Sequence, residues 1–471
     1  LDELLTAVAQ TPLPDRALNN FERFTQATFS KTNFFSYLRQ SPRTLSLLAK
    51  VFGSSPFLSD ILIRNPEYFY WVFDPEVTKT RRGKRELLHD LSRSLRLLKR
   101  KEDRLDLLRL FKRKEILHIA VRDLLRSASV DETLASLSDL AEVLIRKAYE
   151  ICEKEMRRKY GIPFVRNAAG KRVRCGFTVL AMGKLGGGEL NFSSDVDLMY
   201  LYASRRGETS GGRGKGRIPN SEYFERLAQE VSSALHAVRG EGYVYRVDLR
   251  LRPEGEMGLI ANPVQAYKRY YAGRGETWER LSLVKVRPVG GDLRLGKKFL
   301  EMIRPFIYAR PFGAKGRVEV RELKEKIDEK IAAQNQTDFH VKLGLGGIRE
   351  IEFVVQSLQV DLGGKAPAIR EPNTMKGLGK LLRGGFLSPE DHRCLSEAYL
   401  FLRDLENKLQ MVNDQQTHLL PADPDEAGAC AMMLGYENRE TAPAADQLLS
   451  DYRERTRKVH QIFQRIFDKR E

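Results

Sequence analysis

One stretch of the chain, residues 176–202, constrains its fold and its chemistry more than any other. A mainly apolar run leads into a glycine-rich turn, and a second apolar run then carries Asp195 and Asp197. Residues two apart in a strand project from the same face, so these two carboxylates are expected to lie together. Val196 and Leu198 are then expected behind them, in the core. The pattern predicts a strand, a turn and a second strand with two acids on one face.

The residues around these acids indicate phosphate chemistry. Two carboxylates so close repel each other unless a cation lies between them. Hard oxygen ligands suit Mg²⁺, with Mn²⁺ as the alternative, and Mg²⁺ also binds substrate phosphates. Glycines in the turn allow backbone N–H groups to approach an anion. We therefore expect the acids to hold a metal ion, and Gly183, Lys184 and Ser194 to contact the phosphate groups of a nucleotide.

A third acid follows in residues 243–252, which alternate strictly between apolar and charged side chains. The pattern predicts a strand whose charged face presents Asp248 among arginines. A surface ladder of salt-linked charges is the alternative. Because this segment follows the acid pair, we interpret Asp248 as a third metal ligand, and Arg250 and Arg252 as phosphate-binding residues. Three such carboxylates would hold two cations about 3.5–4 Å apart, as nucleotidyl transfer requires.

Length and charge bound the remaining possibilities. A chain of 471 residues is too long for one core, so several domains are expected. Its 80 basic and 63 acidic residues give a net charge of +17, which suits an anionic partner without identifying it. Four widely spaced cysteines form no CxxC pair, which favours a reducing, cytoplasmic location without a zinc site. No apolar run approaches membrane-spanning length, so no membrane partner is expected.

The order of the patterns predicts an α+β fold that is predominantly helical. Helical spacing of apolar residues dominates residues 1–160 and 306–471, which we expect to form an N-terminal helical domain and a C-terminal helical bundle. Residues 161–305 are expected to form a nucleotidyltransferase domain with a small, mixed, mainly antiparallel sheet. A long helical pattern ends at Gly161-Ile162-Pro163, which marks the first boundary.

Three features leave alternatives open. Residues 93–114 are rich in Arg and Lys; we interpret them as a solvated helix face, and a grip on nucleic acid is the alternative. The glycine cluster at residues 342–347 precedes a helix, where it would seat a phosphate or allow two helices to approach closely. Glu350 and Glu352 follow it, and either reach the active site or pair with neighbouring cations.

Several motifs together resemble a known family. The string GKLGGGELNFSSDVDL at residues 183–198 is similar to nucleotidyltransferases of the polymerase-β type. With VDLRLRPEGEMG, GETWER, VKLGLGGIREIEF and QTHLLP, the chain resembles the bifunctional glutamine synthetase adenylyltransferase/adenylyl-removing enzymes from about residue 20 to its end. Members of that family carry two such domains in tandem, and this chain contains one. Its N-F-S-S-D context and its leading helical region resemble the N-terminal, adenylyl-removing half.

The resemblance implies an activity and partners. The adenylyl-removing half takes AMP off a tyrosine of adenylylated glutamine synthetase by phosphorolysis and releases ADP, under control of the nitrogen-regulatory signal protein PII. It implies phosphate and ADP or ATP as small-molecule ligands, and metal-ligand roles for Asp195, Asp197 and Asp248.

Two alternative functions remain. One is the forward reaction, ATP-dependent adenylylation of a protein tyrosine, which would use the same ligands. The other is a non-catalytic, basic scaffold that binds nucleic acid or regulates a partner. Three intact, clustered acids argue against the scaffold, because an inactive site has no need of unpaired carboxylates. We therefore do not expect nucleic acid as a partner.

Overall fold

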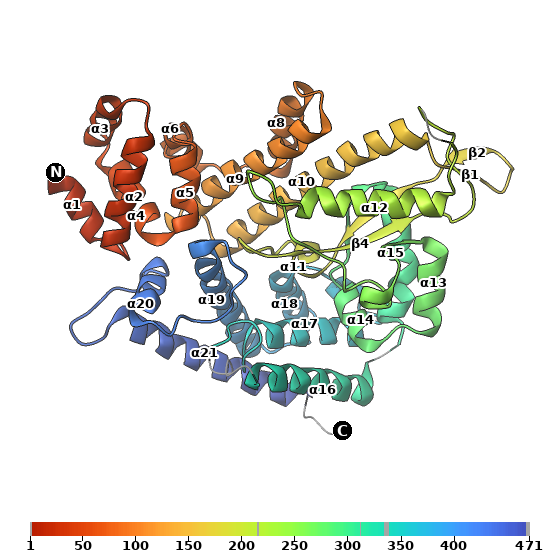
Figure 1. Ribbon diagram of the computed structural model, residues 1–471. Coiled ribbons are helices and arrows are strands. Elements are labelled where there is room, and N and C mark those ends of the chain that lie inside the picture. Colours follow the sequence, from red (N-terminus) through yellow and green to blue (C-terminus); the bar gives the residue numbers. More distant parts are fainter. Residues whose placement is uncertain (1, 214–215, 311, 334–338, 468–471) are drawn as a thin grey trace.

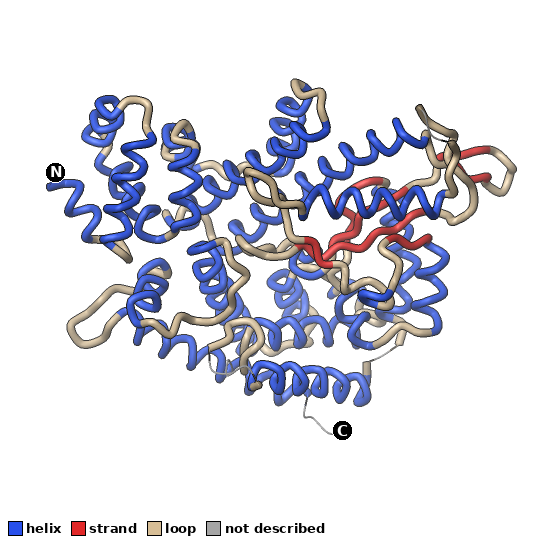
Figure 2. Tube along the Cα trace, viewed as in Figure 1, coloured by secondary structure: helices blue, strands red, loops and turns tan. Residues whose placement is uncertain are grey.

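The computed structural model describes residues 2–213, 216–310, 312–333 and 339–467. Helices make up most of it, and they surround a small sheet (Figures 1 and 2). In the view of Figure 1 the N-terminal helices lie along the upper side and the C-terminal helices along the lower side. A predominantly helical α+β fold, as the sequence predicts, is therefore confirmed.

The N-terminal part is a succession of helices. Proline occupies the first turn of α2, α4, α5 and α7, where its fixed φ favours helix initiation and its missing N–H has no helical partner to lose. The long helix α10 begins after Ser129, whose side chain caps it, and ends at Gly161 with φ +82°, as predicted. The helices are α1 (Asp2–Ala9), α2 (Pro14–Ala27), α3 (Lys31–Gln40), α4 (Pro42–Ser54), α5 (Pro56–Arg64), α6 (Tyr68–Val72), α7 (Pro75–Lys79), α8 (Lys84–Arg96), α9 (Lys101–Leu124) and α10 (Val130–Tyr160).

The central sheet comprises β3 (Phe177–Ala181), β4 (Val196–Tyr202), β5 (Val247–Asp248), β6 (Ala261–Pro263) and β7 (Arg287–Gly291). Strand β3 lies antiparallel to β4 and β7, whereas β4 lies parallel to β5 and β6. The sheet is therefore mixed, as predicted, and its longer pairings, those of β3 with β4 and with β7, are antiparallel. The helix α12 (Asn220–His236) between β4 and β5 returns the chain in the same direction, which makes that pairing parallel. A separate hairpin is formed by β1 (Phe164–Arg166) and β2 (Arg172–Arg174).

The predicted strand at residues 243–252 is reduced to the two residues of β5. Its alternating pattern is real, but the chain turns directly after Asp248. The Asp248 carboxylate accepts the backbone N–H of Arg250 at 2.8 Å, and the carbonyl of Leu249 accepts that of Arg252 at 3.2 Å. These local hydrogen bonds replace the ladder that a longer strand would need.

Of the remaining described helices, three lie between strands of the sheet in sequence and the others come after β7. They are α11 (Gly183–Gly187), α13 (Val264–Gly273), α14 (Thr277–Leu283), α15 (Leu293–Tyr308), α16 (Gly313–Ala332), α17 (Ile348–Leu362), α18 (Thr374–Arg383), α19 (Pro389–Asn413), α20 (Pro424–Met433) and α21 (Ala444–Phe467), with 3-10 turns η1 (Gly255–Met257) and η2 (Pro367–Ile369). Within the described ranges, no helix by itself has the length and apolarity to span a bilayer, and only the bent pair α4–α5 meets that criterion when joined.

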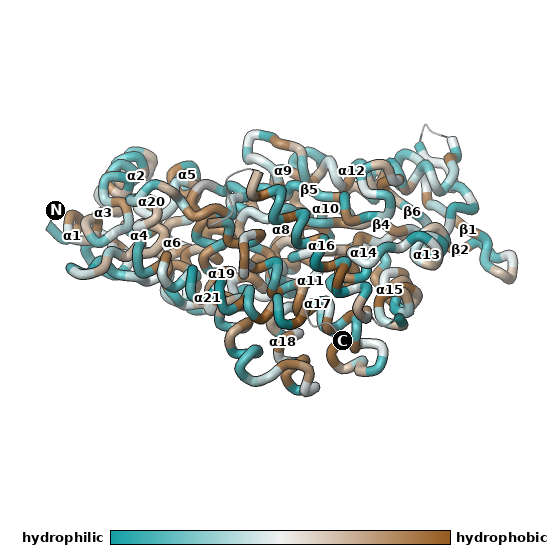
Figure 3. The backbone as a smooth tube through the Cα atoms, turned by 90° about the horizontal axis from the view of Figure 1, so that it is seen from below, coloured by the Kyte–Doolittle hydropathy of each residue, from teal (hydrophilic) through white to brown (hydrophobic). Residues whose placement is uncertain are grey.

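Two hydrophobic cores lie on opposite faces of the sheet. On β4, Val196, Leu198 and Tyr200 belong to the core shared with the N-terminal helices and α12. Met199 and Leu201 belong to the core shared with the C-terminal helices. The predicted burial of Val196 and Leu198 behind the acids is confirmed, since both are 0% exposed. In the hydropathy-coloured trace, apolar stretches alternate with hydrophilic ones along the whole elongated molecule (Figure 3).

The two cores cross the predicted domain boundaries. The first core joins residues on both sides of the boundary at residues 160/161, and the second joins residues on both sides of the boundary at 305/306. The division into residues 1–160, 161–305 and 306–471 as folding units stays a prediction.

The basic stretch at residues 93–114 is not a uniformly solvated face. Arg109 is buried, and its guanidinium donates to the carbonyls of Ala237 and Gly242, each at 2.8 Å. Lys112 is also buried, with its ammonium over the ring of Tyr245. These cations attach α9 to the segment between α12 and β5. Both cations therefore interact with groups inside the protein, which argues against the alternative that this stretch binds nucleic acid.

Candidate active site

The three acids singled out in the sequence come together at one edge of the sheet. Asp197 on β4 stands opposite Asp248 on β5 in the parallel register, and Asp195 directly precedes β4. The carboxylate of Asp197 accepts no hydrogen bond from the described residues. Loss of hydration, together with the Asp248 charge, raises the pKa of Asp197 to about 6. The arrangement concentrates negative charge at Asp197.

Arginines neutralise the two outer acids. Arg246 donates its Nε–H to Asp195 at 2.5 Å and also donates to the carbonyl of Ser193 at 2.6 Å. Arg250 donates to the Asp248 carboxylate, with Nη2 at 2.6 Å from Oδ2. Burial raises the pKa of Asp248, but the hydrogen bonds from Arg250 outweigh it and leave that pKa below its ordinary value. Asp197 is therefore the acid of the three without a guanidinium partner in the described chain.

The donor set matches a hard divalent cation in chemistry. Carboxylate oxygens on adjacent strands are the ligands that Mg²⁺ and Mn²⁺ prefer, and the crowded charge at Asp197 is what such an ion would relieve. With the side chains as they stand, no group of three or more His, Cys, Asp or Glu residues in the described ranges has metal-holding geometry. The outer acids instead face Arg246 and Arg250. The metal-binding role of these acids stays a prediction.

The glycine turn is built around Asp197. Gly183 opens α11 with φ +52°, a conformation that side chains rarely adopt. A Cβ atom at this position would collide with the Asp197 carboxylate. Glycine is therefore required at residue 183 on two grounds, and its bare backbone leaves room beside the acid. Contact between this backbone and a phosphate stays a prediction.

Three other predicted phosphate-binding residues have their polar groups engaged within the protein. Lys184 lies against Glu406 of α19, with Nζ at 2.5 Å from Oε1. The hydroxyl of Ser194 accepts the backbone N–H of Asn191 at 3.2 Å. Arg252 is buried and donates to the carbonyl of Leu249 at 2.7 Å and to that of Gly258, in the turn that follows, at 2.9 Å. In this structure all three residues stabilise the site through contacts within the protein, and their roles in binding phosphate stay predictions.

Two cations that the sequence analysis did not assign to the site face the acids. Lys342 and Arg349 act electrostatically on Asp197 and on each other. Burial lowers the pKa of Lys342, and Arg349 lowers it further. The Lys342 ammonium has no ion pair or hydrogen bond with a described residue. The signal available in the sequence was the motif VKLGLGGIREIEF, which carries both residues.

The glycine cluster in that motif allows close approach of two helices. Gly346 has φ +67°, and a Cβ atom there would collide with the carbonyl of Thr456 in α21. This observation favours the close-approach interpretation of residues 342–347 over a phosphate seat. Glu350 and Glu352 pair with cations: Glu350 lies 3.2 Å from Lys324, and Glu352 lies 2.7 Å from Lys285.

A polar stripe on α19 holds the loop that leads to the acids. Its members follow helical spacing on one face of the helix and are 0% exposed: Arg403, Glu406, Asn407 and Gln410. Asn407 accepts from Asn191 at 2.6 Å, and Gln410 accepts the backbone N–H of Ser193 at 3.0 Å. Burial raises the pKa of Glu406, but Lys184, His418 and Arg403 hold it well below its ordinary value. We name these four residues the α19 stripe.

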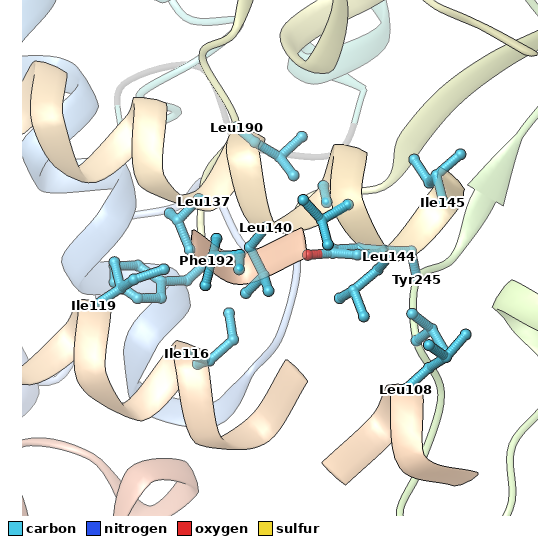
Figure 4. Packing of buried hydrophobic residues seen from close by; sticks show 14 of the residues in the cluster. Leu108, Ile116, Ile119, Leu137, Leu140, Leu144, Ile145, Leu190, Phe192 and Tyr245 are labelled. Atoms are coloured by element: carbon cyan, nitrogen blue, oxygen red, sulfur yellow. The ribbon is translucent and has the colours of Figure 1, made fainter. Parts of the chain in front are cut away.

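Apolar contacts hold the same loop from the other side. Leu190 and Phe192 enter the first core beside Leu137 and Leu140 of α10 (Figure 4). The loop thus lies between the α19 stripe and α10, so its polar and apolar residues are both buried. Two helices that are far apart in the sequence, α10 and α19, therefore fix the backbone that precedes Asp195.

Comparison with known proteins identifies the family. A family model described as glutamate–ammonia ligase adenylyltransferase matches residues 45–302, more than half of the chain. The chain belongs to the glutamate–ammonia ligase adenylyltransferase family. A second model, described as GlnD PII-uridylyltransferase, matches residues 321–467. The family resemblance inferred from the motifs is confirmed.

Relatives of this adenylyltransferase family carry the name bifunctional glutamine synthetase adenylyltransferase/adenylyl-removing enzyme. The protein of Stenotrophomonas maltophilia strain R551-3 is 41% identical over 324 residues, which cover 69% of this chain and 34% of the relative. That of Psychromonas ingrahamii is 35% identical over 426 residues, covering 90% of this chain and 43% of the relative. The matched part of the chain thus spans between 34% and 43% of the length of these relatives.

Proposed function

We propose that this chain removes AMP from adenylylated glutamine synthetase by phosphorolysis, so that ADP and the free tyrosine are the products. The observation that carries the proposal is the cluster of Asp197 and Asp248 on adjacent strands with Asp195 just before the first of them, in a chain of the adenylyltransferase family. The names of the relatives supply the substrate, and the resemblance to the adenylyl-removing half supplies the direction. A cytoplasmic location is part of the proposal and accords with the free cysteines.

The reaction needs charge control more than it needs a base. A phosphate oxygen attacks the phosphorus of the adenylyl group, the bond from that phosphorus to the tyrosine oxygen breaks, and the phenolate then takes a proton from water. Phosphate is already anionic at neutral pH, so its activation requires no strong base. When bound, a divalent cation would be held by the three aspartates and would neutralise charge on the phosphates.

The residues of the chain divide the remaining work. Arg250 is 68% exposed at the edge of the site, where its guanidinium is available to an entering phosphate once it leaves Asp248. Lys342 and Arg349 would offset the negative charge that builds up as two phosphate groups approach. The α19 stripe fixes the loop that precedes Asp195, so the acids need little reorganisation during reaction.

The regulatory partner is proposed to be PII. Residues 321–467 match a model described as GlnD PII-uridylyltransferase, which supports a relation of this region to PII chemistry. Binding of purified PII to the chain, measured by calorimetry with and without adenylylated glutamine synthetase, tests this part. No heat of binding in either condition would remove PII from the proposal.

The decisive experiment follows nucleotide release. The chain is mixed with adenylylated glutamine synthetase and Mg²⁺, with and without phosphate, and the products are separated chromatographically. We expect ADP only when phosphate is present, and none from Asp195→Asn. AMP transfer from ATP onto unmodified glutamine synthetase would instead assign the forward reaction. Absence of both activities would favour the non-catalytic scaffold, whose nucleic-acid binding would then show a strong dependence on salt.

A further inference from the structure

A cavity of about 930 Å³ lies among α13, α14, α15 and α16. Figure 1 shows α13, α14 and α15 grouped below the sheet, with α16 beneath them. None of the three aspartates of the candidate active site lines the cavity, nor do Lys342 and Arg349. Its volume is in the range of pockets that hold small organic molecules. The cavity is therefore separate from the site described above.

The floor of the cavity is apolar and aromatic. The rings of Tyr271 and Phe306 stack with centroids 4.9 Å apart, and Ile303 and Leu281 are buried beside them. Trp278 adds a third, half-buried aromatic side chain. The indole N–H of Trp278 donates to Glu276 at 2.5 Å, so its ring is held in place. A floor of this kind suits a flat, apolar molecular body.

The rim carries cations that have no partner. Lys268, Arg310 and Lys326 are exposed, and their charged groups form no ion pair or hydrogen bond with a described residue. Lys315 lies 3.8 Å from Glu319, a loose pair. Glu276 and Glu322 also line the cavity, and Glu276 is engaged by Trp278. Cations therefore exceed carboxylates around an apolar floor.

Arg280 shows the contrast between a structural cation and these free ones. Its guanidinium donates to the carbonyl of Ile307 at 3.0 Å and to that of Arg310, at the end of α15. It thus joins α14 to α15 and keeps the two walls of the cavity together. The free cations at the rim make no such bond with a described residue, so their charge is available to a ligand.

We propose that this cavity binds a small organic anion with a flat, apolar body. The aromatic floor receives the body, and Arg310 and Lys326 at the rim attract the anionic group. This binding site is additional to the catalytic reaction proposed above and does not depend on it. The three aspartates of the active site would repel the same ligand when no metal is present.

The test uses two dyes of the same shape and different charge. The sulfonate 1-anilinonaphthalene-8-sulfonate has the proposed chemistry, and uncharged N-phenyl-1-naphthylamine is its neutral counterpart. Each is titrated by fluorescence into the full chain without divalent metal. We expect one saturable sulfonate site per chain. The double variant Arg310→Ala, Lys326→Ala should weaken sulfonate binding about fivefold to tenfold while changing neutral-dye binding less than twofold.

Two controls locate the bound dye. Lys31→Ala with Arg43→Ala makes the same change in net charge on the exposed surface of α3 and α4, and should leave binding unchanged. The chain has two tryptophans, Trp71 and Trp278. Energy transfer from tryptophan to the bound sulfonate should disappear in Trp278→Phe and persist in Trp71→Phe.

The opposite outcomes overturn the proposal. They are an absence of saturable sulfonate binding, equal weakening by the two double variants, or energy transfer that survives in Trp278→Phe. Because the mutated rim residues are exposed and unpaired, circular dichroism should show that the rim variant keeps its fold.

Discussion

At the scale of single residues, the candidate active site contains a carboxylate whose ionised form is energetically unfavourable. Asp197 has lost hydration, faces Asp248 and accepts no hydrogen bond from the described chain, so its ionised form is disfavoured. Asp195 and Asp248 differ from Asp197 because each forms an ion pair, with Arg246 and Arg250 respectively. Such unfavourable charge is characteristic of positions retained for function, because a ligand and not the fold compensates it.

The substitution Asp197→Asn should stabilise the metal-free protein at neutral pH. The folded-state pKa of about 6 lies above the usual value, so ionisation of Asp197 costs stability progressively as pH rises from about 4 to 6. Relative to the wild type, the free energy of unfolding of the variant should increase by about 1–2 kcal/mol as the pH rises from about 4.5 to 7. This figure is reduced for solvent screening, because the side chain is half-buried. Urea unfolding at both pH values measures the gain.

The same pair of proteins tests the metal. Millimolar Mg²⁺ should raise the stability of the wild type at pH 7 and leave Asp197→Asn unchanged, because a ligand stabilises only the state that binds it. Equal responses of the two proteins to Mg²⁺, or equal stabilities at both pH values, would contradict the charge crowding inferred at Asp197.

The substitution Arg250→Ala should chiefly weaken the use of phosphate. Its exposed guanidinium at the edge of the site is proposed to receive the entering anion, so its loss should raise the phosphate concentration for half-maximal ADP release about tenfold. Arg274→Ala is the matched control, since Arg274 is 69% exposed and pairs with Glu254 nearby. A phosphate dependence that is the same in both variants would remove Arg250 from this role.

At the scale of elements, the loop between α11 and β4 depends on a helix more than two hundred residues away. Arg403, Glu406, Asn407 and Gln410 place four polar side chains on one fully buried face of α19. They satisfy backbone and side-chain groups of the loop that would otherwise be buried without partners. The loop is therefore ordered by its surroundings, and the position of Asp195 follows from that order.

Removal of one member of the α19 stripe should cost stability. Gln410→Met keeps the volume but leaves the Ser193 N–H without an acceptor, so we expect a loss of about 1–3 kcal/mol in the free energy of unfolding. Gln416→Met, an identical change at an exposed position, should stay within about 0.5 kcal/mol. Urea unfolding of both variants measures the difference. Similar small losses in both would show that the hydrogen bond does not hold the loop.

At the scale of the whole molecule, the sheet is a shared wall between two cores. One face of β4 packs against the N-terminal helices and the other against the C-terminal helices. The helix α10 lies against α9, α12 and β7, so it belongs to the sheet as much as to the helices before it. Neither group of helices is a simple appendage of a catalytic domain.

This arrangement predicts the behaviour of a truncated chain. Residues 161–471 alone would expose Phe177, Val179 and Tyr200, which the first core now buries. We expect such a fragment to lose its near-ultraviolet circular dichroism and to associate during size-exclusion chromatography, because the exposed apolar face has no cover. A monomeric fragment with a native spectrum would instead support a domain boundary at residues 160/161.

The sequence by itself determined the local features of this protein. The alternation of β4 placed Asp195 and Asp197 together with Val196 and Leu198 behind them, and the end of α10 at Gly161 was also predictable. Patterns of period 2 and 3.6 report which side of an element is buried, and the motif strings were sufficient to indicate the family. These signals depend on residues close together in the sequence, so they can be recognised without the structure.

Only the tertiary structure decided which distant groups meet. Lys184 was expected at a phosphate, yet its ammonium pairs with Glu406, 222 residues later. Arg109 was expected on a solvated face, yet it is buried against carbonyls more than a hundred residues away. A charge gives no local sign of its partner, because the energy of a buried ion depends on the groups that the fold brings to it. The acids were therefore predictable, whereas the cations that surround and order them were not.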